Sequence, residues 1–139
     1  DDSPYVSAAM AALPDQANTP TKLTSLSTST SIAIDWVQNT DNDSPGGDIT
    51  GYKIYMDNGN NGAFSLLYYG KNVPSLSQYL VTGLYPGRAY RFMIQAENFN
   101  GFGANSTVAT MYSCVVPSGL DPPTFVSSTS TSMTLQWTA

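Results

Sequence analysis

Histidine is absent from this 139-residue chain, and cysteine occurs once, at position 114. Without histidine, the hydroxyl–imidazole and thiol–imidazole pairs of hydrolases are excluded, together with most transition-metal sites. We expect Cys114 to be a half-buried small apolar residue rather than an interchain disulfide or a reactive thiol. The sequence therefore predicts a protein that is not an enzyme and that has no cofactor or metal.

Charge is also scarce, because charged residues make up 11% of the chain, whereas roughly a quarter is usual in soluble domains. Five Lys and Arg oppose ten Asp and Glu, and the net charge of −5 excludes a nucleic acid partner. No apolar run approaches the roughly 20 residues that cross a bilayer, so membrane insertion is not expected. Ser, Thr and Asn together number 42. Such an uncharged polar surface favours a secreted, extracellular or cell-surface protein.

A long-period repeat organises the chain. A Thr-Ser-Thr-Ser run that begins at Thr28 leads into IAIDW and ends at Trp36, and a second run from Thr129 leads into MTLQW and ends at Trp137. The two tryptophans lie 101 residues apart, which is the length of a domain. The repeat predicts three parts: residues 1–17 as the terminal strand of a preceding unit and a linker, 18–117 as a complete domain, and 118–139 as the first strands of a following unit.

Within the complete unit, apolar residues recur with a period of two, which is typical of strands that pack on one face. Gly, Pro, Asn and Asp separate these strands, as turns require. We expect no helix in this unit, and the fold class is all-β: a seven-stranded, two-sheet β-sandwich. The clearest alternation falls in four segments: 32–36, 52–56, 79–82 and 90–97.

Three local patterns point to a family. Trp36 ends the second expected strand, a Pro-Gly-Gly-Asp turn leads into ITGYKIY, and a Leu-x-Pro-Gly-x-x-Tyr string ends at Tyr90. Together they resemble a fibronectin type III domain, over residues 20 to about 115. An immunoglobulin domain would have two core cysteines, and Cys114 has no second cysteine with which to pair.

The resemblance implies a tyrosine corner, in which the Tyr90 ring is buried and its hydroxyl bonds back to the chain. It also places Trp36 between the two sheets. The expected structural core contains seven residues: Trp36, Tyr52, Ile54, Leu84, Pro86, Tyr90 and Phe92.

Two acidic turns are candidate ligand sites. Asp41, Asp43 and Asp48 crowd one loop as in a calcium site, but Pro45 interrupts the ligand spacing and the loop has no bidentate Glu. An ordinary turn is the favoured interpretation. Asp57 begins an Asp-Asn-Gly sequence that is typical of a hairpin turn.

Attached sugars are the partners most directly suggested by the sequence. Asn105-Ser106-Thr107 is a glycosylation sequon, and Asn42-Asp43-Ser44 is a second one, weakened by the proline that follows it. The Ser/Thr runs at 27–31 and 127–132 could carry O-linked sugar. The alternative for those runs is that they are polar residues suited to β-structure at a turn.

Several aromatic side chains are expected to be partly exposed. They could stack on carbohydrate or pack against a neighbouring domain or protomer, and the alternative is that they only cover the sheet edge. The interface candidates are Phe99, Phe102 and Tyr55, with Tyr85 and either Tyr68 or Tyr69 as further members.

The sequence thus predicts a structural or adhesive extracellular module in a tandem array that forms a rod, stalk or fibre, with glycans as candidate attachments. Its partners would be the neighbouring domains of the same chain and further copies that self-associate into a fibre. Prolines at 20, 122 and 123 would stiffen the joints between units, and a terminal strand such as residues 4–12 could complete a sheet in an adjacent copy. The rival prediction is a carbohydrate- or receptor-binding ectodomain, or the spacer of a secreted polysaccharide-acting enzyme.

Overall fold

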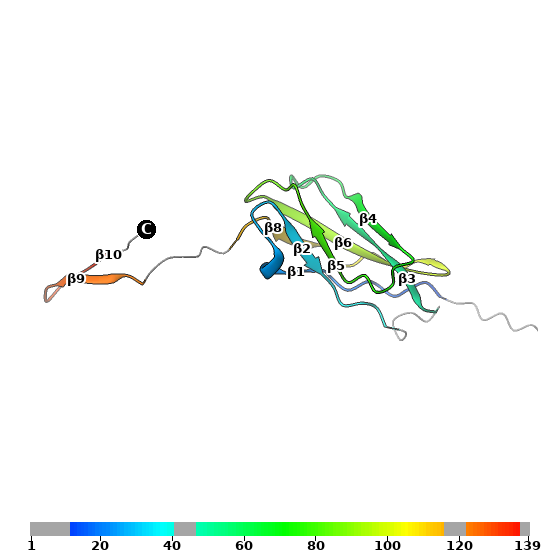
Figure 1. The fold of residues 1–139 in the computed structure, drawn as a ribbon, viewed down its shortest axis with the longest axis horizontal. Helices are drawn as coiled ribbons and strands as arrows, with labels where there is room; N and C mark the ends of the chain where they lie inside the picture. The colour runs from blue at the N-terminus through cyan, green and yellow to red at the C-terminus, as the bar shows by residue number, and fades with distance from the viewer. Residues whose placement is uncertain (1–11, 41–46, 116–121, 137–139) are drawn as a thin grey trace, which may run out of the picture.

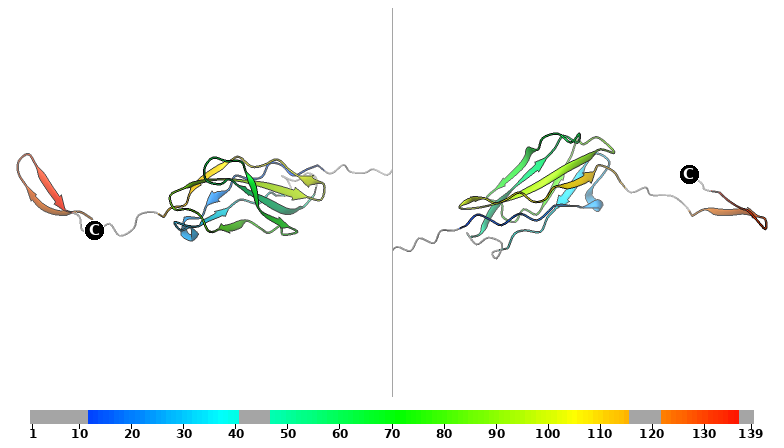
Figure 2. Two further views of the ribbon diagram at one scale, coloured as in Figure 1. Left: turned by 90° about the horizontal axis from the view of Figure 1, so that it is seen from above. Right: turned by 180° about the vertical axis from the view of Figure 1, so that it is seen from behind.

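Two antiparallel sheets form the domain in this computed structural model, which describes residues 12–40, 47–115 and 122–136 (Figures 1 and 2). The smaller sheet has the order β1-β2-β5, and the larger has the order β4-β3-β6-β7, with β8 paired to β6. A short 3-10 turn, η1 (Thr24–Leu26), follows β1. The strands of the two sheets are β1 Thr21–Lys22, β2 Ile32–Asp35, β3 Ile49–Met56, β4 Ser65–Lys71, β5 Gln78–Val81, β6 Ala89–Asn98, β7 Gly101–Phe102 and β8 Ala109–Tyr112. The predicted all-β sandwich is confirmed.

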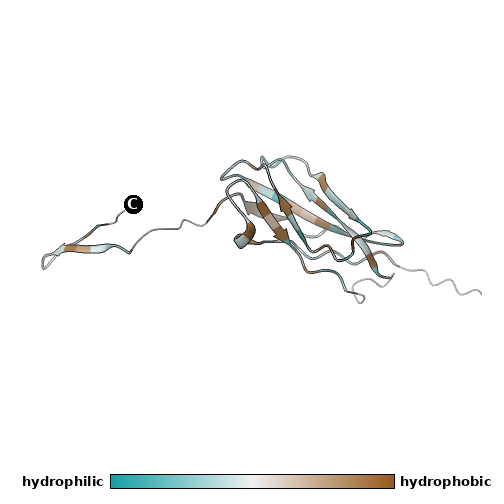
Figure 3. Cartoon of the chain, in the orientation of Figure 1, coloured by the Kyte–Doolittle hydropathy of each residue, from teal (hydrophilic) through white to brown (hydrophobic). Residues whose placement is uncertain are grey.

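Apolar side chains that alternate along the strands fill the space between the two sheets. Along β6, every second residue from Tyr90 to Asn98 is buried, and the residues between them are partly exposed. Figure 3 shows the apolar bands on the strands of both sheets. The apolar residues with no exposed surface come from both layers: Ile32, Ile34, Tyr52, Ile54, Phe92, Ile94 and Ala96.

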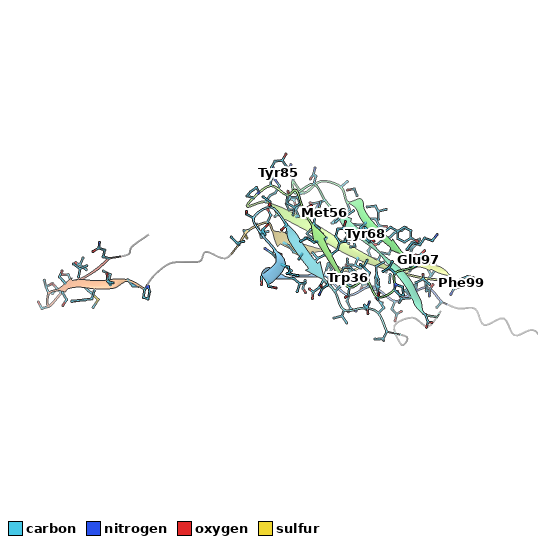
Figure 4. All side chains as sticks on the ribbon, in the orientation of Figure 1. Trp36, Met56, Tyr68, Tyr85, Glu97 and Phe99 are labelled. Atoms are coloured by element: carbon cyan, nitrogen blue, oxygen red, sulfur yellow. The ribbon has the colours of Figure 1, made fainter. Side chains whose placement is uncertain are left out.

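Six of the seven residues expected in the core are buried: Trp36, Tyr52, Ile54, Leu84, Tyr90 and Phe92. Trp36, labelled in Figure 4, packs edge-on against Tyr52, and the ring centroids are 5.6 Å apart. Pro86 is exposed, which corrects its expected place in the core. It lies in the turn before β6, where its fixed φ shapes the backbone without burying the ring.

The turn before β6 forms the tyrosine corner that the family resemblance implies. The Tyr90 ring is buried, and its hydroxyl accepts a 3.0 Å hydrogen bond from the backbone N–H of Tyr85. Gly87 has a φ of 73°, a left-handed conformation that glycine adopts without the strain of a Cβ atom. The corner therefore ties the β5–β6 connection to the core.

Residues 12–17, which we name the entry strap, lie against the sandwich. The Asn98 side-chain amide donates a 2.8 Å hydrogen bond to the Ala12 carbonyl, and the Gln16 amide donates another of 2.8 Å to the Asn105 carbonyl. The division of the chain into units at 17/18 and 117/118 stays a prediction, and residues 1–11 lie outside the described residues.

The start of the entry strap and the end of β8 lie at opposite ends of β6. Ala12 is bonded to Asn98, the last residue of β6, whereas Tyr112 pairs with Ala89, the first. At about 3.3 Å per residue, a ten-residue strand separates these points by roughly 30 Å. Lys22 Nζ secures the exit by donating to the Tyr112 carbonyl at 2.6 Å.

Cys114 is a free, exposed cysteine, which corrects its expected half-burial. Strand pairing in β8 ends at Tyr112, so Cys114 lies beyond the last residue that the sheet holds. Within the described residues, no helix is long and apolar enough to cross a membrane.

A separate hairpin follows the domain and consists of β9 (Thr124–Ser128) and β10 (Met133–Gln136). Its turn repeats a turn of the domain at the 101-residue spacing. The hydroxyls of Thr129 and Ser132 are 2.7 Å apart, as are those of Thr28 and Ser31. The backbone N–H of the threonine also donates to the serine carbonyl in both turns, at 2.8 and 3.0 Å. The two segments therefore share local conformation as well as sequence.

Candidate functional site

The outer face of the larger sheet gathers the aromatic and charged side chains that the core excludes. Because Tyr52 and Ile54 point inward on β3, Lys53 and Tyr55 must point outward. Register pairs Lys53 with both Tyr69 on β4 and Gln95 on β6. We name this surface the aromatic face and define it by six residues: Lys53, Tyr55, Tyr69, Gln95, Glu97 and Phe102.

Lys53 lies at the centre of the aromatic face. Its Nζ atom is 3.4 Å from the centroid of the Phe102 ring and 5.1 Å from that of Tyr69. The two rings meet edge to face with centroids 6.0 Å apart. Cation–π attraction therefore holds the lysine in place and covers one face of the Phe102 ring.

Tyr69 is fixed from its other end by Glu97. Its hydroxyl donates to the carboxylate, with distances of 2.7 and 2.6 Å to the two oxygens (Figure 4 labels Glu97). This hydrogen bond, with burial and the negative charge of Glu97 as further causes, raises the pKa of Tyr69 to about 12. The phenol is therefore neutral at physiological pH and acts as a donor.

Tyr55 and Gln95 form a separate set of hydrogen bonds on the aromatic face. The Tyr55 hydroxyl donates to Gln95 Oε1 at 3.1 Å, and Gln95 Nε2 donates to the Gly103 carbonyl at 2.9 Å. The polar groups of this face thus already have partners within the domain. Such a surface suits contact through ring edges and methylenes, because these hydrogen bonds already occupy its polar atoms.

The ion pair between Asp57 and Arg91 holds the turn between β3 and β4 against β6. Asp57, whose side chain is 1% exposed, bonds Arg91 Nε through Oδ2 at 2.8 Å. Its Oδ1 accepts the backbone N–H groups of Arg91 and Gly59 at 3.0 and 3.1 Å. Burial favours the neutral acid, but these hydrogen bonds and the guanidinium charge outweigh it and lower the pKa of Asp57.

The residues proposed from the sequence fall in different places. Tyr55 and Phe102 share the aromatic face and are partly exposed, while Phe99 is 94% exposed in the turn between β6 and β7. Tyr85 is exposed at the other end of the sandwich from Phe99 (Figure 4). Phe99 and Tyr85 therefore do not join the cluster around Phe102.

Sequence reasoning missed Lys53, Glu97 and the burial of Asp57, and it left Tyr68 and Tyr69 undecided. Tyr68 points inward and stacks on Tyr79 with centroids 4.7 Å apart, so Tyr69 is the member of the pair on the outer face. The alternation of apolar and polar residues along β3 and β6 could have placed Lys53 and Glu97 on the outer face of the sheet.

The glycosylation candidates have different outcomes. Asn105 is exposed in the connection between β7 and β8, and its side chain has no hydrogen bond within the described residues. Its sequon partner Thr107 bonds the Thr19 hydroxyl. Asn42 lies outside the described residues.

The acidic loop considered as a calcium site is described only from residue 47, because residues 41–46 lie outside the described residues. Among the residues that are described, no group of three potential metal ligands occurs.

A shallow hollow of about 220 Å³ lies on the smaller sheet beside η1. It is lined by leucines at 23, 26 and 80, together with Ala33, Ile34, Gln78 and Tyr79. This lining is mostly apolar, so the hollow offers packing surface rather than reactive groups.

The two sheets, their antiparallel pairing and the tyrosine corner define an immunoglobulin-like β-sandwich without a core disulfide. The fibronectin type III domain family matches residues 18–112, and the chain belongs to that family. Domains of this kind are generally non-catalytic structural or binding modules, and they are common in extracellular, surface and adhesion proteins.

Solved structures support the same fold at low identity. The sixth fibronectin type III domain of human fibronectin type III domain containing protein 3 is 24% identical, with a TM-score of 0.61, over 80% of this chain and 95% of that one. The chicken CNTN1 FN1–FN3 fragment is 17% identical with a TM-score of 0.60, over 91% of this chain and 44% of that one. Domains A168–A170 of titin are 18% identical with a TM-score of 0.58, over 75% of this chain and 33% of that one. No curated protein sequence matches the chain.

Proposed function

We propose that the chain is a structural or adhesive extracellular module, part of a tandem array of fibronectin type III domains that forms a rod or stalk. The proposal rests chiefly on the positions of Ala12 and Tyr112 at opposite ends of β6. A domain with ends so placed adds its own length to an array. The hairpin turn that repeats at the domain spacing supports a following unit of the same kind.

Short, stiff joints fit this arrangement. The exposed Pro122 and Pro123 directly precede β9, where a following unit would begin, whereas Pro20 is buried within the domain between the entry strap and β1. Proline restricts φ and so limits the angles that consecutive units can adopt. The entry strap adds hydrogen bonds that hold the start of the domain to its body.

Small-angle X-ray scattering of the intact protein tests the array. We expect the maximum dimension to grow by roughly 30–40 Å for each unit, which is the length of a ten-residue strand plus its turns. A compact particle, with a dimension that grows only as the cube root of the mass, would overturn the proposal. Sedimentation over a concentration series tests self-association into a fibre, and a constant mass would exclude it.

Attached sugar is part of the proposed surface. The exposed, unbonded amide of Asn105 is suited to carry a glycan in a eukaryotic secreted protein. Mass spectrometry of native material should find a peptide that contains Asn105 with added hexose mass. An unmodified peptide throughout would exclude glycosylation at this residue.

The aromatic face supports a second candidate function, the recognition of a carbohydrate or receptor. Rings of Tyr55, Tyr69 and Phe102 line one surface, although Lys53 covers one side of Phe102. A glycan array with the wild type and with Phe102→Ala and Phe99→Ala separates the two functions. Binding that is lost in Phe102→Ala but kept in Phe99→Ala favours recognition by the aromatic face, and the absence of binding in the wild type favours the scaffold.

A further inference from the structure

Three Asn–Gly bonds occur in the sequence, at Asn58, Asn61 and Asn100. Such bonds can undergo spontaneous deamidation. The glycine backbone nitrogen loses its proton and attacks the asparagine side-chain carbon, a C–N bond forms, and ammonia leaves. Water then opens the cyclic imide to aspartate or isoaspartate. Glycine permits the required backbone geometry because it lacks a Cβ atom.

The first bond is held in an unreactive arrangement. The attacking nitrogen, that of Gly59, donates its proton to the buried Asp57 carboxylate at 3.1 Å. An anionic acceptor stabilises the N–H form and opposes its deprotonation. Asn58 Oδ1 also accepts two backbone N–H groups, from Asn60 at 3.0 Å and Gly62 at 3.2 Å, which hold the side chain away from Gly59.

The third bond lies in a tight hairpin. The backbone N–H of Asn100 donates to Asn98 Oδ1 at 2.9 Å, and its side-chain amide donates to the Ala12 carbonyl at 3.4 Å. Gly101 is paired opposite Asn98 between β6 and β7. The entry strap and the strand pairing therefore restrain both partners of this bond.

Asn61 and Gly62 have the opposite environment. Asn61 is exposed and takes a left-handed φ of 55°, and its side chain has no hydrogen bond within the described residues. The Gly62 nitrogen donates only to the neutral amide oxygen of Asn58. Arg91 Nη2 donates to the Gly62 carbonyl at 2.6 Å, so a positive charge contacts the same residue whose nitrogen must become negative.

We propose that Asn61 is a site of spontaneous deamidation in the folded protein and reacts ahead of Asn58 and Asn100. The ion pair directs this order, because the Asp57 anion protects one bond and the Arg91 cation assists the other. The product places a new carboxylate in the turn that Arg91 anchors, and the isoaspartate form also lengthens the backbone there.

Peptide mapping by mass spectrometry, after incubation at mildly alkaline pH, tests the proposal. In the folded protein we expect conversion at Asn61 to exceed that at Asn58 and Asn100 by at least tenfold. In concentrated urea the three bonds should react at similar rates, because the restraints are gone. Asn61→Gln should remove the early conversion, and the matched control Asn100→Gln should leave it unchanged. Earlier conversion at Asn58 or Asn100 in the folded protein, or the same order of rates in urea, would overturn the proposal.

Discussion

Replacing Asp57 by asparagine gives the sharpest test of how the larger sheet is held together. The substitution keeps the size of the side chain but removes the charge that Arg91 and the backbone N–H groups of Arg91 and Gly59 share. The new amide can take two orientations. In one, its NH₂ group faces the Arg91 Nε–H donor, and in the other it faces the two backbone N–H donors. In either orientation, at least one hydrogen bond is replaced by a contact between two donors.

The magnitude follows from burial. Removing one partner of a fully buried ion pair costs about 3–5 kcal/mol, since the remaining charge stays desolvated. Asp57 is almost fully buried, but the Arg91 side chain is 26% exposed and can recover part of its hydration. We therefore expect Asp57→Asn to lower the free energy of unfolding by about 2–4 kcal/mol.

Urea unfolding followed by circular dichroism measures this loss. A double-mutant cycle with Arg91→Met isolates the interaction, and we expect coupling of about 1–3 kcal/mol. A loss below about 1 kcal/mol, the value usual for an exposed pair, would refute the inferred burial of the interaction. Additive effects of the two substitutions would refute the pairing itself.

The pH dependence provides a second measurement on the same variant. Because the folded domain lowers the pKa of Asp57, the carboxylate contributes stability above the unfolded pKa of about 3.9. That contribution is lost as the pH falls through the lower, folded value. The wild type should lose stability more steeply than Asp57→Asn below about pH 4, and parallel curves would contradict the assignment.

Three further predictions concern the core and the aromatic face. Tyr90→Phe removes the acceptor of the Tyr85 N–H and should cost about 1 kcal/mol in urea unfolding, and an unchanged midpoint would exclude a stabilising corner. Trp36→Ala should cost about 3–5 kcal/mol, or leave the domain unfolded, and a loss below about 1 kcal/mol would place the indole outside the core. Ultraviolet titration should detect a phenol with a pKa of about 12, and Glu97→Gln should lower that pKa toward about 10. An unchanged pKa would refute the hydrogen bond between Tyr69 and Glu97. Because that pKa is raised, the contact stabilises the fold below about pH 10 and is lost as the pH rises through about 12.

The sandwich could be predicted because its strands alternate cleanly. On β6, every second residue from Tyr90 to Ala96 is apolar and buried, and β3 buries Tyr52 and Ile54 on either side of Lys53, so the period and the phase can both be read from the sequence. The places of Trp36 and Tyr90 in the core could be predicted because Trp36 ends an alternating strand and Tyr90 ends the Leu-x-Pro-Gly-x-x-Tyr string. Pro86 follows the same pattern, but a turn residue can be required for its φ without being buried.

The aromatic face could be predicted only in part, because its contacts depend on register. β4 carries four consecutive apolar or aromatic residues from Leu66 to Tyr69, so alternation cannot show which ring points outward. A bulge between Ile54 and Tyr55 then shifts the pairing. Lys53 and Phe102 are 49 residues apart in the sequence, and only the folded sheet brings them together.

The attachment of both the entry strap and β8 to β6 has a mechanical consequence. Tension applied along the chain would pass from the strap contact at Asn98 to the β8 pairing at Ala89–Phe92, so it would load the ladder lengthwise. Interstrand hydrogen bonds then resist together as a set instead of opening one at a time. The resistance of the domain to stretching would therefore be set by the rate at which this single ladder shears, rather than by the equilibrium stability of the whole fold.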